Sequence, residues 1–323
     1  MAAPKPIRLK AYAKINLSLR ITGRAENGFH MLDMLMASVD IYDIVSLTIR
    51  DDKAVNIRMA DASGAPFDIA LETNTAYKAA KALISEFNLP GCDVSIIKNI
   101  PLAAGLGGSS ADAAGVIYGL CKLHDIDVKG GKIMNIALGA GSDVPYMLTG
   151  GFARVTGLGE IVDSGQWAVD GGQIKPGDKN CKLLHMIIAK GTGGCSTAEA
   201  YAAFDQMTNY KRKMRKKNNF SLLTSHFAND LQAASISLCP EIAGTLKLLQ
   251  STNPLCAQMT GSGSACFALY ESETAARAAH DKIAEKIEYC RVCETVEKGI
   301  EETNLQLILI PFQKQTSCGD FLI

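Results

Sequence analysis

The chain has 323 residues, of which 47% are hydrophobic and 20% charged, a composition typical of a globular protein with a substantial core. This length favours about two domains. Lys plus Arg equal Asp plus Glu at 33 each, so the formal net charge at pH 7 is zero. A protein that binds nucleic acid needs a basic face to neutralise phosphates, so we expect no nucleic-acid partner.

Neither a membrane segment nor a secretory signal is evident. The stretch MAAPKPIRLKAYAKINL has no apolar signal-peptide region, and no run of about 18 apolar residues occurs. We therefore expect no membrane partner, and a cytoplasmic protein whose ten scattered cysteines are reduced. Cys290 and Cys293 have C-x-x-C spacing but lack two further nearby ligands for zinc. We expect them to be ordinary cysteines on a strand or turn, and we expect no protein-built metal site.

Hydrophobic periodicity predicts mixed strands and helices in the first half of the chain. Ile15, Leu17, Leu19 and Ile21 alternate with polar residues, which predicts a strand with one buried face. Asn74 is a suitable N-cap for a helix that Pro90-Gly91 would end. The predicted elements are, in chain order, strands near 15–21 and 45–50, a helix at 74–87, a strand at 93–100, a glycine-rich turn at 105–108 and a helix at 109–120.

The second half shows no regular alternation of strand and helix, which favours an α+β fold over a doubly wound sheet. Residues 157–180 are rich in Gly and Asp and predict loops or a hairpin near a domain boundary. The basic run 211–217 (KRKMRKK) could bind RNA, but a solvated loop is the favoured interpretation. Before this run we expect a strand at 183–189 and a helix at 197–208. After it we expect helices at 227–236 and 240–250, a strand at 265–270 and a helix at 273–287.

The densest chemical signal is PLAAGLGGSSADAAG, residues 101–115. Glycines followed by helix formers predict a turn that becomes a helix N-terminus, where free N–H groups and the helix dipole bind anions. Ser109 or Ser110 could cap this helix or turn a hydroxyl toward a phosphate or its Mg²⁺. The segment lacks the Gly-Lys-Ser/Thr of a Walker A loop and the last glycine of a dinucleotide fingerprint. A turn that merely caps a helix remains an alternative.

A second signal is Asp143 within Gly141-Ser-Asp-Val-Pro145. A carboxylate fixed in a turn among small residues suits a general base. Pro145 should push Val144 away from helical angles. An aspartate that simply caps a turn is the alternative.

Two further features accompany these signals. Lys14 and Asn16 lie two residues apart, so they share one face of the first strand, although they could equally be polar residues on the solvent side of an edge strand. Residues 259–264 (MTGSGS) form a second glycine-rich loop, which could close over a phosphate chain or be a simple hairpin turn.

The order and spacing of these motifs carry more information than any one of them. AKINL (13–17), NGFH (27–30), the loop 101–113, GSDVP (141–145) and TGSGS (260–264) together resemble the GHMP kinase superfamily. Within that superfamily they are similar to the branch that phosphorylates cytidine-diphosphate-linked methylerythritol (CDP-methylerythritol). The resemblance runs from about residue 11 to about residue 270.

The resemblance implies a two-domain α+β fold. An ATP-binding domain like domain 2 of ribosomal protein S5 would span residues 1–165, and a ferredoxin-like domain with a C-terminal extension would span 166–323. It also implies ATP-dependent phosphorylation of the 2-hydroxyl of CDP-methylerythritol in the non-mevalonate isoprenoid pathway. ATP and Mg²⁺ would be the cofactors, and the protein would be a monomer or a weak homodimer.

The resemblance also assigns roles to residues. Asp143 would take the proton of the attacking hydroxyl, and Lys14 would keep Asp143 ionised and offset phosphoryl charge. The ATP phosphates would lie on Pro101, Leu102, Ala103, Ala104, Gly105, Leu106, Gly107, Gly108, Ser109, Ser110 and Ala111. The cytidylyl substrate would contact Asn16, Phe29, His30, Thr197 and Tyr201.

Two other hypotheses remain open at this point. The same chemistry on another small alcohol would retain Asp143 but should lack the NGFH motif, which is present. A non-catalytic nucleotide- or RNA-binding module should have lost Lys14 or Asp143, and both are present. The extra length beyond about residue 295 exceeds that of a typical member of the family and has no functional account from the sequence.

Overall fold

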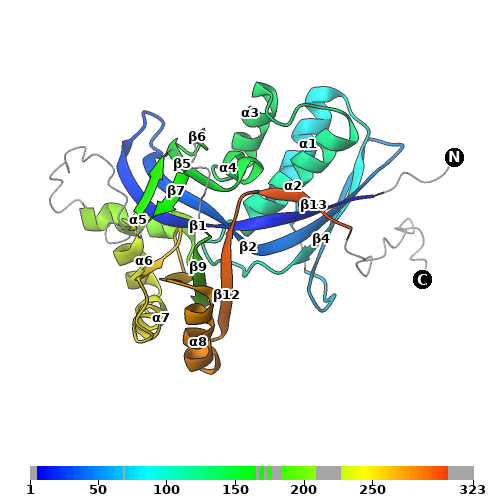
Figure 1. Ribbon diagram of the computed structural model, residues 1–323. Helices are drawn as coiled ribbons and strands as arrows, with labels where there is room; N and C mark the ends of the chain where they lie inside the picture. Colours follow the sequence, from blue (N-terminus) through cyan, green and yellow to red (C-terminus); the bar gives the residue numbers. More distant parts are fainter. Residues whose placement is uncertain are drawn as a thin grey trace, which may run out of the picture.

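Two long antiparallel strands organise the fold: β1 (Ile7–Arg24) and β2 (His30–Ile49) pair along almost their whole length. The computed structural model describes residues 6–67, 70–164, 167–170, 173–176, 183–208 and 227–304. Within these ranges β1 and β2 lie inside an eleven-stranded sheet whose main path is β10-β11-β9-β12-β2-β1-β13. Figure 1 shows the strand pair crossing the molecule, with α1, α2 and α3 on one side and α6, α7 and α8 beyond the other.

The N-terminal part adds short strands and a helical layer to this pair. Strand β4 pairs antiparallel with β2, β3 runs parallel to β4, and β5 joins β2 on its other half. The elements are β3 (Val55–Asp61), η1 (Leu71–Thr73), α1 (Thr75–Phe87), β4 (Cys92–Lys98), α2 (Gly108–Leu123), α3 (Gly131–Ala140), α4 (Val144–Thr149), β5 (Phe152–Gly157) and β6 (Ile161–Asp163).

The C-terminal part continues the same sheet. Strand β9 lies between β11 and β12, and α7 and α8 pack against these strands. The elements are β9 (His185–Lys190), α5 (Thr197–Thr208), α6 (Gln232–Leu238), α7 (Glu241–Gln250), β10 (Cys256–Met259), β11 (Cys266–Tyr270), α8 (Glu273–Ile283), η3 (Ala284–Lys286), β12 (Tyr289–Val296) and β13 (Ile300–Glu302). Strands β7 (Trp167–Asp170) and β8 (Gln173–Pro176) form a separate hairpin, as predicted for this region.

The final strands return to the N-terminal part. Strand β12 pairs with β9 over most of its length and then with β2 at Thr295 and Val296. Strand β13 pairs antiparallel with β1. The sheet is therefore continuous from one half of the chain to the other.

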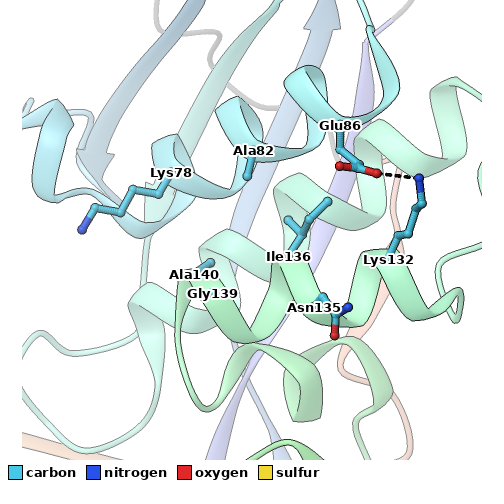
Figure 2. Close-up of a pocket in the computed structure, with 8 residues that line it drawn as sticks. All are labelled: Lys78, Ala82, Glu86, Lys132, Asn135, Ile136, Gly139 and Ala140. Carbon is cyan, nitrogen blue, oxygen red and sulfur yellow. Dashed lines mark ion pairs between the residues drawn. The ribbon is translucent and has the colours of Figure 1, made fainter. Parts of the chain in front are cut away.

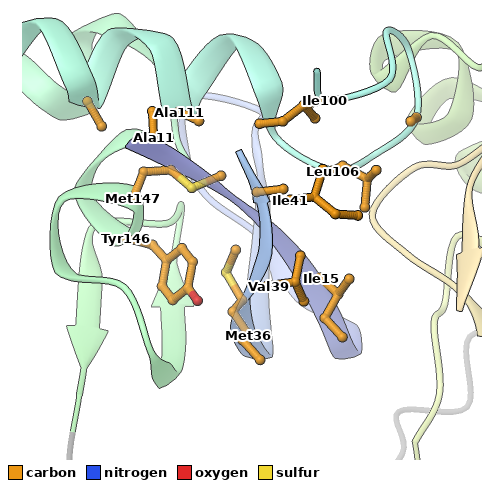
Figure 3. Packing of buried hydrophobic residues seen from close by; sticks show 14 of the residues in the cluster. Ala11, Ile15, Met36, Val39, Ile41, Ile100, Leu106, Ala111, Tyr146 and Met147 are labelled. Carbon is orange, nitrogen blue, oxygen red and sulfur yellow. The ribbon is translucent and has the colours of Figure 1, made fainter. Parts of the chain in front are cut away.

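The core is thickest around β1, and here one prediction was wrong. We expected one buried face, yet every residue from 11 to 19 is buried. Helix α2 packs on one side of β1, while α4 packs against the same strand (Figure 3). The strand is also covered from elsewhere, since Lys14 donates its amide to Leu106 O and Asn16 donates its amide to Thr260 Oγ1, so polar residues of this strand are also inside.

Local predictions were confirmed for several elements. The Asn74 side chain accepts a hydrogen bond from the amide of Tyr77 at 3.0 Å and so caps α1 as expected. Cys290 and Cys293 lie on β12, and all eight cysteines of the described ranges are free. The basic run 211–217 lies outside the described residues. Of the helices that the structure describes, none has the length and apolar content needed to cross a bilayer.

Candidate active site

A glycine loop at residues 101–107, here called the first glycine loop, leads into α2. Ala103, Gly105 and Gly107 all have positive φ angles, of 49°, 73° and 73°. Gly107 is the N-cap of α2. In the first backbone hydrogen bond of the helix, the amide of Ala111 donates to the carbonyl of Gly107 at 2.8 Å. The backbone amides of residues 108–110 belong to the first turn of the helix and have no intrahelical acceptors. This end of the helix can therefore bind an anion.

The second glycine loop, residues 259–264, packs directly on the first. Ser264 donates its amide to Ala103 O at 3.3 Å, and Ala265 donates to Ala104 O at 3.1 Å. A Cβ added to Gly105 would lie 2.4 Å from the carbonyl oxygen of Thr260. The two backbones are therefore in direct contact at this point, and the second loop supports the conformation of the first.

Lys14 and Asp143 meet beside the first glycine loop. Lys14 Nζ lies 3.3 Å from Asp143 Oδ2, with side-chain exposures of 5% and 24%. The Lys14 side chain passes the loop, because a Cβ added to Gly107 would lie 3.1 Å from its Cγ and 3.2 Å from its Cε. The buried ammonium therefore holds a partly accessible carboxylate next to the anion-binding end of α2.

Asp143 precedes α4, and here the local prediction was wrong. Val144 is the first residue of this helix instead of an extended one, and Pro145 lies in the first turn. Proline is tolerated there because its missing N–H would have had no intrahelical acceptor. The Asp143 side chain makes no capping bond, so the turn does not consume its oxygens.

Asn16 is fully buried, which excludes the solvent-facing alternative for the Lys14–Asn16 pair. Its Oδ1 accepts a hydrogen bond from Lys14 Nζ at 2.7 Å. Its backbone amide donates to Thr260 Oγ1 at 2.9 Å. Asn16 thus joins Lys14 to the second glycine loop.

The other predicted substrate residues gather at the far end of the β1–β2 pair. Phe29, in the turn between the two strands, has 68% of its surface exposed. His30 stacks on Tyr201 of α5, with ring centroids 4.7 Å apart and planes 23° apart. Burial first, and then the carboxylate of Asp143, raise the pKa of Tyr201, so Tyr201 lies within electrostatic reach of Asp143.

Asp205 is a member of this cluster that the sequence did not reveal. Its Oδ1 lies 2.9 Å from His30 Nε2, and Arg24 forms an ion pair with its other oxygen. Partial burial alone would raise the pKa of Asp205, but the hydrogen bonds from Arg24 and His30 lower it. Only the helical spacing from Tyr201 to Asp205 could have indicated that both residues face the same partner.

Thr197, the first residue of α5, contacts the second glycine loop instead of the His30 cluster. Its hydroxyl lies 2.9 Å from Ser262 Oγ in the second glycine loop. The structure therefore brings Thr197 to the loops and Tyr201 to His30.

A buried ion cluster beneath the first glycine loop was also missed. Lys98 Nζ contacts Asp43 and lies 2.6 Å from Asp112 Oδ2, and all three side chains are almost fully buried. Asp43 Oδ1 also accepts the amides of Asn99 and Ile100, at 2.6 and 2.8 Å, where the chain enters the loop. The sequence signal for this cluster was Asp112, a charged residue within the run of small residues in α2. A buried charge requires a partner, so Asp112 could have indicated one.

A separate groove of about 480 Å³ lies between α1 and α3. Figure 2 shows Ala82, Ile136 and Ala140 along it and the ion pair of Glu86 with Lys132 at one end. None of the predicted site residues lines this groove. In the described ranges, no group of three or more His, Cys, Asp or Glu side chains could hold a metal ion.

Comparison with known proteins finds relatives along most of the chain. The family model for the GHMP kinases N terminal domain matches residues 74–151, and that for GHMP kinases C terminal matches residues 211–288. A 4-diphosphocytidyl-2-C-methyl-D-erythritol kinase of Clostridium tetani is 33% identical over 298 residues, which is 90% of this chain and 100% of the relative. A kinase of the same name from Desulfitobacterium hafniense is 34% identical over 306 residues, 91% of this chain and 97% of its own.

Solved structures agree at the level of the fold. A crystal structure of 4-(cytidine 5'-diphospho)-2C-methyl-D-erythritol kinase superposes with a TM-score of 0.67 at 24% identity, covering 90% of this chain and 99% of its own. A mevalonate kinase structure gives a TM-score of 0.59 at 12% identity, covering 91% and 100%. The α+β fold class implied by the resemblance is confirmed.

Proposed function

The chain belongs to the GHMP kinase superfamily and, within it, to the 4-diphosphocytidyl-2-C-methyl-D-erythritol kinases, and from this premise we propose that it transfers the γ-phosphoryl group of ATP to the 2-hydroxyl of CDP-methylerythritol. This reaction would form part of the non-mevalonate route to isoprenoid precursors. ATP is the phosphoryl donor expected of a kinase of this family.

We propose that Asp143 is the general base and Lys14 its electrostatic partner. The observation that carries this proposal is the 3.3 Å contact between Lys14 Nζ and Asp143 Oδ2 beside the N-terminal end of α2. A substrate hydroxyl next to Asp143 would pass its proton to the carboxylate as it attacks the γ-phosphorus. Lys14 would offset the charge on the transferred group, and most of the rate gain would come from such positioning and electrostatics.

The ATP phosphates would lie on residues 101–111, where glycines allow close backbone approach and the first turn of α2 supplies N–H donors. Mg²⁺, when bound, would neutralise phosphate charge, and it takes most of its ligands from phosphates and water. A Cβ added to Gly141 would lie 3.7 Å from Ser110 Oγ. The Ser110 hydroxyl thus lies near Gly141 in the turn that carries Asp143, and its oxygen would suit a hard cation held mainly by ATP.

The cytidylyl group would bind at the far end of the β1–β2 pair. The exposed ring of Phe29 and the ring of Tyr201 offer two faces for the base, and His30 offers hydrogen bonds to its edge. Asn16 and Thr197 lie at the second glycine loop, so they would contact the rest of the substrate.

We propose a division into residues 1–165 and 166–323, a cytoplasmic monomer or weak homodimer, and no nucleic-acid or membrane partner. The balanced charge supports the last point, since Lys plus Arg and Asp plus Glu are 33 each.

The test is a coupled ADP-release assay on wild type, on Asp143→Asn and on the matched control Asp281→Asn, whose side chain is 78% exposed on α8. CDP-methylerythritol is offered beside mevalonate, homoserine and galactose. We expect turnover with the cytidylyl substrate alone, lost by at least about 10³-fold in Asp143→Asn and retained in the control. Turnover with another alcohol would overturn the substrate, and full activity of Asp143→Asn would overturn the base.

A further inference from the structure

The segment 297–302, here called the C-terminal clasp, makes close backbone contacts with the helix that follows Asp143. A Cβ added to Gly299 would lie 1.8 Å from the carbonyl oxygen of Met147. A Cβ added to Gly150, where α4 ends, would lie 1.8 Å from the Gly299 amide nitrogen. Neither position has room for a side chain, so this contact fixes the distance between the two backbones.

The clasp is fixed to β1 on its other side. Tyr12 donates its amide to the carbonyl of Gly299 at 2.9 Å, and its hydroxyl donates to Glu301 Oε2 at 2.7 Å. Strand β13 pairs with β1 over the preceding residues 9–11, and Ile300 is 7% exposed in the core. Because β1 also carries Lys14, the clasp ties α4 to the strand that bears the partner of Asp143.

Helix α4 connects the clasp with the catalytic pair. The carbonyl of Asp143 accepts a hydrogen bond from the amide of Met147 at 3.0 Å. The Met147 side chain is buried and reaches the first glycine loop, because a Cβ added to Gly107 would lie 2.3 Å from its Cε. Figure 3 shows Tyr146 and Met147 reaching from α4 toward the β1–β2 pair. A helix of six residues has little stability of its own, so its neighbours determine its position.

We propose that the C-terminal clasp is a positioning element for phosphoryl transfer. Gly299 sets the location of α4 and thereby the location of Asp143 relative to Lys14 and the substrate hydroxyl. This inference rests on the proposed function, since it takes Asp143 as the base. It also gives a role to the first residues of the extra C-terminal length that the sequence left unexplained.

The test compares glycine variants inside and outside this contact. Gly299→Ala and Gly150→Ala should displace α4, whereas Gly139→Ala and Gly244→Ala lie on α3 and α7 in open space and serve as matched controls. A displacement of about 1 Å at a catalytic group costs on the order of 100-fold in rate. We expect kcat to fall by about 10–100-fold in the first pair, with KM for ATP and for CDP-methylerythritol within about twofold of wild type. The controls should keep wild-type kcat.

Titration with a tight-binding ATP analogue counts competent sites, so that kcat refers to folded protein only. A purely structural role would lower the number of titrated sites and leave kcat per site unchanged. If the glycine variants do not fold, Tyr12→Phe is the milder variant, because it removes only the bond to Glu301 and keeps the ring. We expect it to lower kcat several-fold without a change in either KM.

Wild-type kcat per site in the variants would overturn the proposal, and so would a KM for ATP that rises in step with the loss of kcat. The second result would assign the effect to the first glycine loop instead of α4. Failure of the proposed function looks different, because wild type would then show no turnover of CDP-methylerythritol or Asp143→Asn would stay active.

Discussion

Among single residues, Lys98 supports the first glycine loop, because its buried Nζ contacts the buried carboxyl groups of Asp43 and Asp112. Lys98→Met would leave the buried carboxylate of Asp43 without its cation, and breaking a buried pair in this way costs about 3–5 kcal/mol. Asp112→Asn keeps the shape of the side chain and leaves the buried pair of Lys98 and Asp43 intact, so it should cost at least about 2 kcal/mol less. Urea unfolding of both variants measures the difference. Equal losses would contradict this account of the cluster.

The same cluster predicts a dependence of stability on pH. Burial, the largest effect, raises the pKa of Asp112 above its ordinary value of 3.8, and its Oδ1 has no hydrogen-bond partner among the described residues. The native state therefore binds a proton that the unfolded chain releases above about pH 4, so stability falls as the pH rises from there. We expect the free energy of unfolding to decline less between pH 5 and pH 8 in Asp112→Asn than in wild type. Parallel declines would show that Asp112 does not titrate in this range.

Asp205 allows a prediction about substrate binding. Its carboxylate holds His30 Nε2 at 2.9 Å while His30 stacks on Tyr201, so it restrains the orientation of the ring. Asp205→Asn exchanges a charge-assisted hydrogen bond for a neutral one, a loss of about 1 kcal/mol. Steady-state kinetics should show KM for CDP-methylerythritol raised about fivefold and KM for ATP unchanged. A rise in the ATP KM alone would contradict a role at the cytidylyl end.

At the scale of elements, alanine substitution at two helical glycines should change the free energy of unfolding in opposite directions. Gly139 lies inside α3 with open space at its Cβ position, so Gly139→Ala should stabilise by about 0.5–1 kcal/mol. Gly115 lies inside α2, where a Cβ would meet Val45 Cγ2 at 2.9 Å. The branched Val45 cannot move aside, so Gly115→Ala should destabilise by about 1–3 kcal/mol. Thermal unfolding of the two variants decides the signs, and a shared sign would refute the packing argument.

Elements with local signals were predictable, and elements defined by long-range pairing were not. Helix α1 carries its own N-cap, Asn74, and β4 carries a clear apolar pattern, so both were predicted within a few residues. Strand β13 has three residues and exists through its pairing with β1, almost 300 positions away. A strand this short has too few residues to show a hydrophobic period.

The residues of the candidate site fall into the same two groups, those with a local sequence signal and those without one. Lys14, Asp143 and the first glycine loop lie in compact motifs, so the sequence could name them together. Lys98 and Asp205 are single charged residues whose partners come from distant elements, and no local pattern identifies such pairs. The burial of Asn16 also depended on the layers that cover β1, which only the tertiary structure reveals.

For the whole molecule, the continuous sheet predicts that both halves unfold together. Strand β12 joins β9 to β2, and a single hydrophobic cluster contains buried residues from β1 through β13, among them Leu9, Ile187 and Ile300. Because both halves contribute to this one core, calorimetry should show one cooperative transition with equal calorimetric and van't Hoff enthalpies. A saturating ATP analogue at about 100 times its Kd should stabilise by about 2.7 kcal/mol and move that transition as a unit. Two transitions, with only the first shifted by the analogue, would instead support independent domains divided near residue 165.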